Sequence, residues 1–544
     1  MRKAAGELFN AASYCAAVLL VLCVGSNPTS ARDLLTAHVP EIVADHGVPV
    51  VGAPDPAARL QLDIAIPLRD PASLTSALGA IYDPASPSWH HYLSVAEFTS
   101  HFSATEKDYN AAAEFFRASG LRIISLSANR FLIEAEGTVA QIERVFHVKL
   151  LLYKHPLEAR SFMAPDREPT IDLDVPVLHV TGLDDLVLPA PRLVQPATDQ
   201  PHFHGTGSGP RGYYYGSDMR AAYYGGSKLT GKGQSVGLME LKPYDPADIG
   251  LYFNYVKQPL KVHVKGISTD GNPWKCTGCH DGEQALDIEY AISMAPGLKK
   301  MQVYVGHSPE SVLGRMASDD TSLQLSTSWG WHERFESDDP LFQEMAAQGQ
   351  TFLTASGDYS SLKKSGPWPE EDANLVAVGG TDVVTAGPGG AWTAETGWAY
   401  SAGGPSLDRT IKIEPYQLPF INKQNGGSFK LRNVPDISAN ANTDFWVCSG
   451  GKCRGGWGGT SFASPIWAGY VALINEQAAA NGQPPVGFLN PALYGLAGDG
   501  NYNSLFHDVT KGKSGKFRAV KGYDLITGIG SQNGEALIDA LTNQ

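Results

Sequence analysis

Positive charge is scarce in this 544-residue chain, which carries 42 Lys and Arg against 56 Asp and Glu and has a formal net charge of -14. A protein that binds nucleic acid through a broadly basic surface needs the opposite balance, so this class is excluded. The negative charge suits a protein that stays soluble in an acidic medium, but it does not select a function. Long internal repeats and disordered charge blocks are also missing.

Long apolar runs are equally rare. The longest covers residues 14–24 and is shorter than the about 18 residues that a membrane span requires. Arg2 and Lys3 precede it and small residues follow it through Ala31, which is typical of a secretory signal. We therefore interpret residues 1–31 as a signal peptide and expect a secreted protein that has no membrane anchor once the signal is removed.

Cysteine is rare too, with six in the chain, of which Cys15 and Cys23 lie in the expected signal. The other four form two close pairs, in the strings Cys-Thr-Gly-Cys and Cys-Ser-Gly-Gly-Lys-Cys. Two such pairs can ligate zinc, but an oxidising extracellular compartment favours two short-loop disulfides. The expected disulfides join Cys276 to Cys279 and Cys448 to Cys453.

Residues 35–188 have the pattern of a small α+β domain. Apolar residues alternate over 60–68, as in a strand with one buried face, and Ser103 can cap a helix over 104–119. Two strand–helix–strand passes favour a ferredoxin-like fold. The other predicted elements are helices over 72–82 and 138–146 and strands over 121–127, 130–136 and 148–154.

A segment rich in Pro and Gly follows at residues 189–212 and has no apolar period, as expected of an exposed linker open to proteolysis. In residues 213–544, apolar strands alternate with helices. This alternation predicts an α/β domain with a mostly parallel sheet covered by helices on both faces. The expected strands are 235–241, 261–267, 300–305, 323–329, 351–355 and 375–378, and the expected helices include 283–294, 310–318 and 340–348.

The most specific string is Gly-Gly-Thr-Ser-Phe-Ala-Ser-Pro at residues 458–465, ahead of an apolar helical run. A serine here lies at the start of a buried helix, where free amide groups and the helix dipole favour a developing oxyanion. Ser461 is therefore a candidate nucleophile. The alternative interpretation is that Thr460 or Ser461 is a simple helix N-cap.

A nucleophilic serine needs a base. His204 lies in the Pro/Gly-rich segment with no helical pattern after it, and Asp270 lacks the residue pattern of a subtilisin-type aspartate. Glu283 and Asp287 are better candidates, since residues four apart share one helix face. Two like charges so close have separated titrations, which suits general acid–base work in a mildly acidic medium. A solvated acidic helix face is the alternative.

Three strings together resemble the sedolisin family, the serine-carboxyl or kumamolisin-like peptidases. They are Glu-x-x-x-Asp at 283–287, Ala-Ser-Gly-Asp at 355–358 and Gly-Thr-Ser at 459–461, in the family's order. The resemblance implies a subtilisin-like catalytic domain that cleaves proteins through an acyl-enzyme on Ser461. Glu283 would be the general base, Asp287 would hydrogen-bond to it and tune it, and neutral Asp358 would donate to the oxyanion. Because Asp358 must be protonated, an acidic optimum is expected.

Two more residues match the family's pattern, and one string departs from it. Glu240 resembles a glutamate that extends the acid network, and Trp329 resembles the tryptophan beside that glutamate. After Asp358, however, Tyr359 and Ser360 replace the usual Ser-Gly. This departure puts the conformation of the turn that supports Asp358 in question.

Two loops near the C-terminus resemble the family's calcium site. Calcium takes six to eight oxygen ligands from carboxylates and carbonyls. The resemblance implies one structural calcium ion in the catalytic domain. Its ligands would be the side chains of Asp508 and Asp524 and the backbone carbonyls of Val509, Val520 and Gly522.

Residues 86–98 resemble a Tyr-Leu segment of the family's propeptides, so residues 35–188 would form an activation propeptide and residues 189–212 its processing linker. The propeptide would inhibit its own catalytic domain by placing its C-terminal tail in the cleft until acid loosens the contact. We expect a monomeric, self-processing zymogen that acts on proteins or peptides. Three alternatives stay open: a tripeptidyl-aminopeptidase of the same family, a subtilisin-type peptidase with a Ser-His-Asp triad, and a non-catalytic secreted binding protein.

Overall fold

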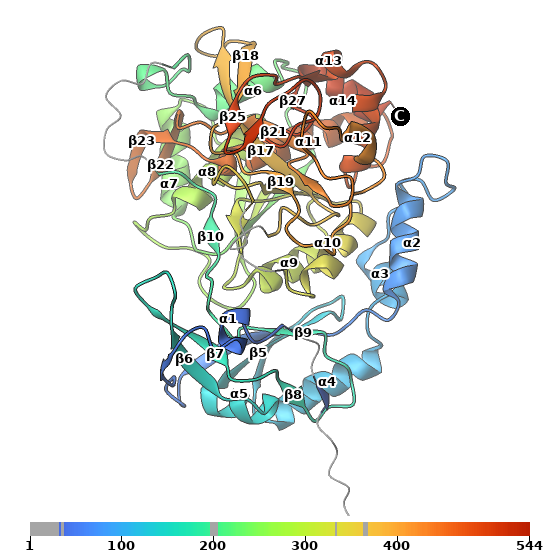
Figure 1. Ribbon diagram of the computed structural model, residues 1–544. Helices are drawn as coiled ribbons and strands as arrows, with labels where there is room; N and C mark the ends of the chain where they lie inside the picture. Colours follow the sequence, from blue (N-terminus) through green and yellow to red (C-terminus); the bar gives the residue numbers. More distant parts are fainter. Residues whose placement is uncertain (1–31, 34–36, 196–204, 332–333, 363–367, 544) are drawn as a thin grey trace, which may run out of the picture.

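The computed structural model describes residues 32–33, 37–195, 205–331, 334–362 and 368–543. The expected signal peptide and His204 lie outside this part of the chain. The described residues form an N-terminal module, blue to teal in Figure 1, which packs beneath an α/β domain drawn in green to red. None of the described helices is long and apolar enough to cross a membrane.

The N-terminal module contains the expected β-α-β-β-α-β unit of a ferredoxin-like fold. Its antiparallel sheet consists, in spatial order, of β4 (Arg122–Leu126), β5 (Leu132–Thr138), β3 (Arg59–Ala65) and β9 (His179–Thr181). Helices α4 (Glu106–Ala118) and α5 (Val139–Phe146) cover one face of this sheet. Ile64 of β3 packs there in one apolar cluster with Phe116 and Phe146.

The strand predicted over 148–154 is present, but assigning it to the ferredoxin-like sheet was wrong. It forms β6 (Leu150–Lys154), which pairs with β2 (Val50–Gly52) and β7 (Ser161–Pro165) in a separate three-stranded sheet. The strand that completes the ferredoxin-like sheet is β9. Local periodicity identifies a strand but not its partner, and partners are set by contacts distant in sequence.

Two local predictions in this module also differ from the structure. The α4 cap is Thr105 instead of Ser103, because the Thr105 hydroxyl accepts the Asp108 amide at 3.1 Å. A helix that the sequence analysis did not predict begins after Ser94, whose hydroxyl caps it. The further elements are β1 (Arg32–Asp33), α1 (Glu41–Ala44), α2 (Pro71–Ile81), α3 (Val95–His101) and β8 (Thr170–Ile171).

The α/β domain is built on an eight-stranded sheet. Its order is β12 (His263–Ser268), β13 (Lys300–Val305), β11 (Ser235–Glu240), β14 (Gln324–Thr327), β16 (Thr351–Ala355), β17 (Val376–Thr385) and β18 (Trp392–Gly397), with β21 (Ile437–Asn440) also paired to β17. All of these pairs are parallel except that between β17 and β18. The mostly parallel sheet expected from the sequence is therefore confirmed.

Helices cover both faces of this sheet. On one face lie α6 (Gly216–Tyr223), α7 (Pro246–Tyr255), α8 (Gly282–Met294), α11 (Thr460–Ala480) and α14 (Gly534–Thr542). On the other lie α9 (Pro309–Asp319) and α10 (Asp338–Ala347). Successive residues of β11 separate in the same way, since Leu238 belongs to the first core and Met239 to the second.

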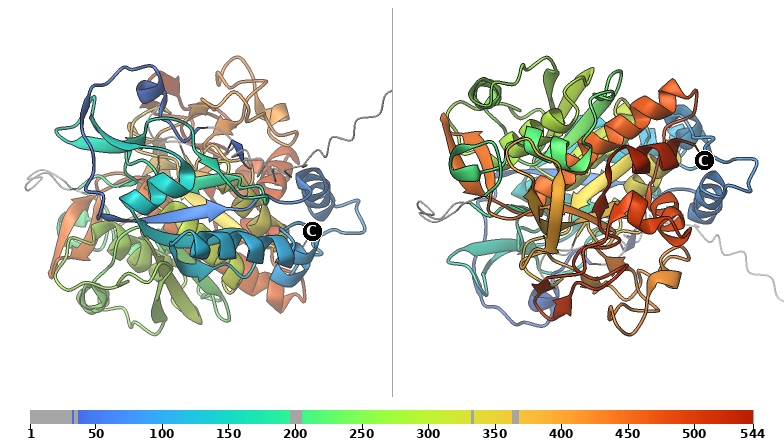
Figure 2. Two further views of the ribbon diagram at one scale, coloured as in Figure 1. Left: turned by 90° about the horizontal axis from the view of Figure 1, so that it is seen from below. Right: turned by 90° about the horizontal axis from the view of Figure 1, so that it is seen from above.

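The N-terminal module packs on the face that carries α9 and α10, as the view from below in Figure 2 shows. Apolar residues of both parts share one core there, including Phe98 of α3 and Phe342 of α10. At the edge, the Tyr82 hydroxyl donates to the Ala346 carbonyl at 2.7 Å. The two parts are thus joined by a continuous apolar interface with polar contacts at its rim.

Short elements complete the α/β domain. They are β10 (Ala190–Pro191), η1 (Pro210–Gly212), β15 (Trp329–Gly330), β19 (Gly404–Pro405), η2 (Leu418–Phe420), β20 (Asn433–Val434), β22 (Phe445–Ser449), β23 (Lys452–Trp457), α12 (Asn490–Gly498), α13 (Tyr502–Leu505), β24 (Phe506–His507), β25 (Lys513–Ser514), β26 (Phe517–Arg518) and β27 (Ser531–Gln532). Ligand sites of parallel α/β sheets lie at the carboxyl ends of the strands. Here the ends of β11, β14 and β16 face the N-termini of α8 and α11.

Candidate active site

Ser461 lies in the first turn of α11, a long helix buried through the core. Gly459, the residue directly before the helix, has a φ of 128°, which glycine adopts without the strain of a side chain. A Cβ at this position would collide with the Arg192 carbonyl oxygen and would lie 2.7 Å from Asp358 Oδ2. Glycine therefore allows a peptide carbonyl and a carboxyl group to approach the same point beside Ser461.

Glu283 and Asp287 lie one turn apart on α8, which packs against α11, and both are buried. Neither oxygen of Glu283 accepts a hydrogen bond of normal geometry from the described residues. Ser461 is nevertheless near enough that its hydroxyl lowers the pKa of Glu283, against the larger effect of burial, which raises this pKa well above its usual value. The two strings that suggested a nucleophile and its base are thus brought together.

The acid network extends from Asp287 to Glu240, at the end of β11. Asp287 Oδ1 accepts the Ser328 hydroxyl at 2.8 Å, and Trp329 Nε1 donates to Glu240 Oε2 at 2.8 Å. Burial raises the pKa of both carboxyls well above their usual values, and repulsion from the neighbouring carboxyl adds to this rise. Burial outweighs the like-charge repulsion that the spacing had suggested as the cause.

Asp358 follows β16 and hydrogen-bonds to Thr460, the residue before Ser461. Its Oδ1 accepts the backbone amide and the hydroxyl of Thr460 at 2.9 and 2.8 Å, whereas its buried Oδ2 has no hydrogen-bond partner among the described residues. Burial raises the pKa of Asp358 to about 7, although the Thr460 hydrogen bonds oppose the rise. At acidic pH the carboxyl is therefore protonated and has a proton to donate.

The unusual residues after Asp358 have structural explanations. Ser360 has a φ of 68°, so it adopts the left-handed conformation that glycine favours at such a turn. The Tyr359 ring lies beneath the Arg192 guanidinium, 4.9 Å from its carbon to the ring centroid.

The C-terminal tail of the N-terminal module passes through this site. Ala190 and Pro191 form β10, antiparallel to β15, and the Arg192 amide donates to the Ser328 carbonyl at 2.8 Å. Beyond Arg192, Val194 exchanges two backbone hydrogen bonds with Gly458, at 2.8 and 3.1 Å. This start of the predicted exposed linker is therefore an ordered strand. Its backbone bonds to distant loops left no local pattern in the sequence.

The Arg192 carbonyl points at Ser461, the candidate nucleophile. Its oxygen accepts the Ser461 amide at 3.2 Å and also the Ser461 hydroxyl. The tail thus places a peptide carbonyl against Ser461, which has no exposed surface. Asp270, the aspartate considered for a triad, instead forms an ion pair with His307 at 2.9 Å.

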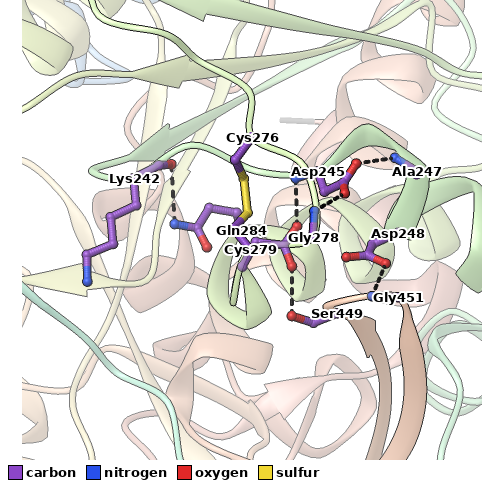
Figure 3. Close-up of a disulfide and its surroundings, with 11 residues drawn as sticks. Lys242, Asp245, Ala247, Asp248, Cys276, Gly278, Cys279, Gln284, Ser449 and Gly451 are labelled. Atoms are coloured by element: carbon purple, nitrogen blue, oxygen red, sulfur yellow. Dashed lines mark hydrogen bonds between the residues drawn. A yellow bond between two sulfur atoms is a disulfide. The ribbon is translucent and has the colours of Figure 1, made fainter.

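Both expected disulfides are present, between Cys276 and Cys279 and between Cys448 and Cys453. Figure 3 shows the first disulfide beside the start of α8. Asp281, the residue before that helix, accepts the Asp245 amide and the Ser449 hydroxyl at 2.8 and 2.7 Å. This carboxyl links the loop of one disulfide to the hairpin of the other, next to Glu283.

The loops expected to bind calcium lie together near the C-terminus. Gly522 donates its amide to Asp508 at 3.0 Å, and Val520 donates its amide to Asp524 at 3.1 Å. Val509 directly follows Asp508. Within the described residues there is no group of three or more His, Cys, Asp or Glu that could hold a metal. The expected calcium ligands comprise only two carboxylates, with backbone carbonyls for the rest, and this all-oxygen chemistry fits calcium.

Comparison with known proteins places both parts of the chain. A model described as the Pro-kumamolisin activation domain matches residues 47–186, and one described as the Subtilase family matches residues 320–488. Kumamolisin of Bacillus sp. (strain MN-32) is 29% identical over 485 residues, which cover 82% of this chain and 85% of that protein. Sedolisin of Pseudomonas sp. (strain 101) is 28% identical over 519 residues, with 86% and 84% covered.

One further relative and one solved structure are also similar to this chain. Tripeptidyl-peptidase 1 of Rattus norvegicus is 24% identical over 562 residues, covering 91% of this chain and 93% of that protein. The solved structure of Pseudomonas sedolisin, a serine-carboxyl proteinase, shares the fold with a TM-score of 0.54 and 24% identity, over 61% of this chain and 98% of that one. With its activation domain and its subtilisin-like fold, the chain belongs to the sedolisin family of serine-carboxyl peptidases.

Proposed function

We propose that this protein is a secreted, acid-acting endopeptidase, made as a monomeric zymogen that processes itself. The observation that supports this proposal most directly is the Arg192 carbonyl, held against the Ser461 hydroxyl near the buried carboxyl groups of Glu283 and Asp358. A peptide bond, a nucleophile, a base and an oxyanion donor thus share one point. The subtilisin-type triad has no comparable support, because Asp270 is engaged elsewhere.

In the proposed reaction, Glu283 takes the proton of Ser461 as Oγ forms a bond to the substrate carbonyl carbon. Asp358, neutral at acidic pH, donates from Oδ2 to the oxyanion together with the Ser461 amide. The C–N bond then breaks, and the proton held by Glu283 passes to the leaving amine. Water hydrolyses the acyl-enzyme with Glu283 again as base. When Glu240 and Asp287 hold their protons, they do not repel the negative charge that Glu283 must carry before it takes the serine proton.

Endopeptidase action is favoured over removal of tripeptides by the path of the tail. The chain enters from the N-terminal module, runs through Ala190 and Pro191 to Arg192, and continues to Val194. The cleft thus admits a chain that extends beyond three residues on the amino side of the attacked carbonyl. A tripeptidyl-peptidase instead requires a free amino group at that distance.

The decisive experiment is digestion of a denatured protein with the matured enzyme between pH 3 and 7, with fragment ends read by mass spectrometry. Internal peptides that form only at acidic pH are expected. Ser461→Ala and Glu283→Ala should each remove almost all cleavage, whereas His204→Ala should leave it unchanged. Exclusive release of tripeptides would identify the exopeptidase, a strong loss with His204→Ala would support the triad, and no cleavage at any pH would support a binding protein.

We further propose that one structural calcium ion binds Asp508 and Asp524 together with the carbonyls of Val509, Val520 and Gly522. Support comes from the juxtaposition of these loops and from their oxygen-only chemistry. The ion would fix the loops and takes no part in the peptide-bond reaction, because none of its proposed ligands has a described contact with Ser461.

A further inference from the structure

The side chain of Arg192 is buried inside the α/β domain, with 3% of its surface exposed. Its Nη2 atom lies 3.2 and 3.1 Å from the two carboxylate oxygens of Glu370, which is fully buried. A propeptide tail that only blocked the cleft would not need a buried ion pair. The tail therefore inserts a cation into a pocket that presents an anion.

The walls of this pocket fit a guanidinium group. The Tyr359 ring stacks against it at 4.9 Å, and the Trp368 carbonyl lies 3.5 Å from Nη2. Space for the group exists because residue 330 is a glycine, since a Cβ there would collide with the guanidinium. A flat, delocalised cation suits an aromatic face and a carboxylate better than a compact ammonium does.

Glu370 is the element that makes the pocket selective. Burial raises the pKa of Glu370 and the Arg192 cation opposes this rise, so the carboxylate form of Glu370 depends on a cation in the pocket. Among the described residues, Arg192 provides the only ion pair of Glu370. When the tail leaves, the carboxyl group remains in a buried pocket without that cation. A substrate with an apolar side chain would leave it unpaired, and a basic one would restore the pair.

The backbone fixes which residue this pocket reads. Arg192 donates its amide to the Ser328 carbonyl, and its own carbonyl oxygen accepts the Ser461 amide and hydroxyl. The residue whose side chain fills the pocket is thus the one whose carbonyl is attacked. Leu193 and Val194 continue on the leaving side, where Val194 pairs with Gly458.

We propose that Tyr359, Gly330 and Glu370 form a subsite selecting arginine, and less strongly lysine, immediately before the cleaved bond, and that the first maturation cut is made between Arg192 and Leu193. This inference rests on the proposed peptidase function. The cut is an ordinary hydrolysis: Ser461 Oγ bonds to the Arg192 carbonyl carbon, the bond to the Leu193 nitrogen breaks, and Glu283 transfers the serine proton to that nitrogen. Water then releases Arg192 as the propeptide's carboxyl terminus.

The test compares matched peptides that differ only in having arginine, lysine or norleucine before the scissile bond. The wild-type enzyme is expected to show the highest kcat/KM with arginine. Glu370→Gln keeps the shape but removes the charge, so it should lower the arginine-to-norleucine ratio about 30-fold or more, as expected for a buried, hydrogen-bonded charge pair. The control Glu371→Gln removes a neighbouring carboxyl that contacts Leu407 and should keep the wild-type ratio.

A second readout is the precursor itself, whose released propeptide should end at Arg192 by mass spectrometry. Equal ratios in wild type and Glu370→Gln, or a wild-type preference for norleucine, would overturn the subsite. Cleavage after other residues would do the same while leaving the peptidase function intact. A wild-type enzyme that cleaves no peptide and no denatured protein would instead refute the function. If Glu370→Gln does not fold, the wild-type ratio and the propeptide end still decide.

Discussion

At the scale of single residues, the chemistry depends on where the protons lie. Asp358 has a buried oxygen without a partner and a pKa raised to about 7, so it carries a proton in acid and loses it as the pH rises through neutrality. In the proposed reaction, the donor to the oxyanion would therefore be present below about pH 7 and lost above it. This sign is the reason why we predict an acidic optimum.

Asp358→Asn keeps a hydrogen-bond donor at this position but removes the group that titrates. An asparagine amide donates at every pH, so the decline of kcat/KM above neutral pH should weaken, with reduced activity at the acidic optimum. Asp358→Ala removes the donor and should lower kcat about 100-fold or more. The measurement is kcat/KM between pH 3 and 8. Wild-type profiles in both variants would show that Asp358 has no part in the reaction.

The strings of four site residues could be read from the sequence because each is local. Glu283 and Asp287 are one helical turn apart, and Ser461 starts a long apolar helix. Glu370 could not be found in this way, because its partner Arg192 is 178 residues away in the sequence. Both the burial of Glu370 and its pairing with Arg192 arise only when the chain folds. Local patterns give the chemistry of a site, and long-range packing gives its specificity.

At the scale of elements, strands and helices of the α/β domain were predicted closely because apolar strands alternate with helices. β16 occupies exactly the residues expected, 351–355, whereas the strand expected over 323–329 divides into β14 and β15. The division matters, because β15 leaves the sheet to pair with β10 of the tail. Because β15 is defined by its pairing with a distant segment, the local sequence contains no pattern that separates it from β14.

The C-terminal loops provide a test at this scale. Removal of calcium with EGTA should lower the thermal unfolding midpoint by about 5 °C or more, since a ligand that binds only the folded state stabilises it. Restored calcium should reverse the shift, and magnesium should not. Asp508→Ala should unfold at the same temperature with and without EGTA. A wild-type midpoint that ignores both reagents would contradict the calcium site.

At the scale of the whole molecule, the proposed zymogen would be inhibited by the N-terminal module and the tail together, and its response to acid would depend on groups whose pKa values are shifted in opposite directions. Burial raises the pKa of carboxyl groups at the interface, such as that of Glu344, which reaches about 8. Such groups stabilise the closed zymogen more at low pH and less as the pH rises. They therefore cannot be what loosens the module in acid.

Buried histidines change the stability of the closed form with pH in the opposite direction. His179 of β9 stacks on His38 at 4.3 Å and contacts Phe335 of the α/β domain at 5.0 Å. Burial, with a further effect of His38, lowers the pKa of His179 to about 3. Its contribution to the stability of the closed form is complete above about pH 6.5 and decreases as the pH falls toward 3, by at most about 1.4 kcal/mol per pH unit.

Acid opening of the zymogen should therefore depend on His179. In a Ser461→Ala background, which prevents cleavage, hydrogen exchange in the N-terminal module should increase as the pH falls from 6.5. His179→Phe keeps an aromatic ring against Phe335 but cannot take up a proton, so opening should require a lower pH. The exposed His101→Gln serves as the control and should open like the parent. Opening of His179→Phe at the parental pH would show that acid acts on another group.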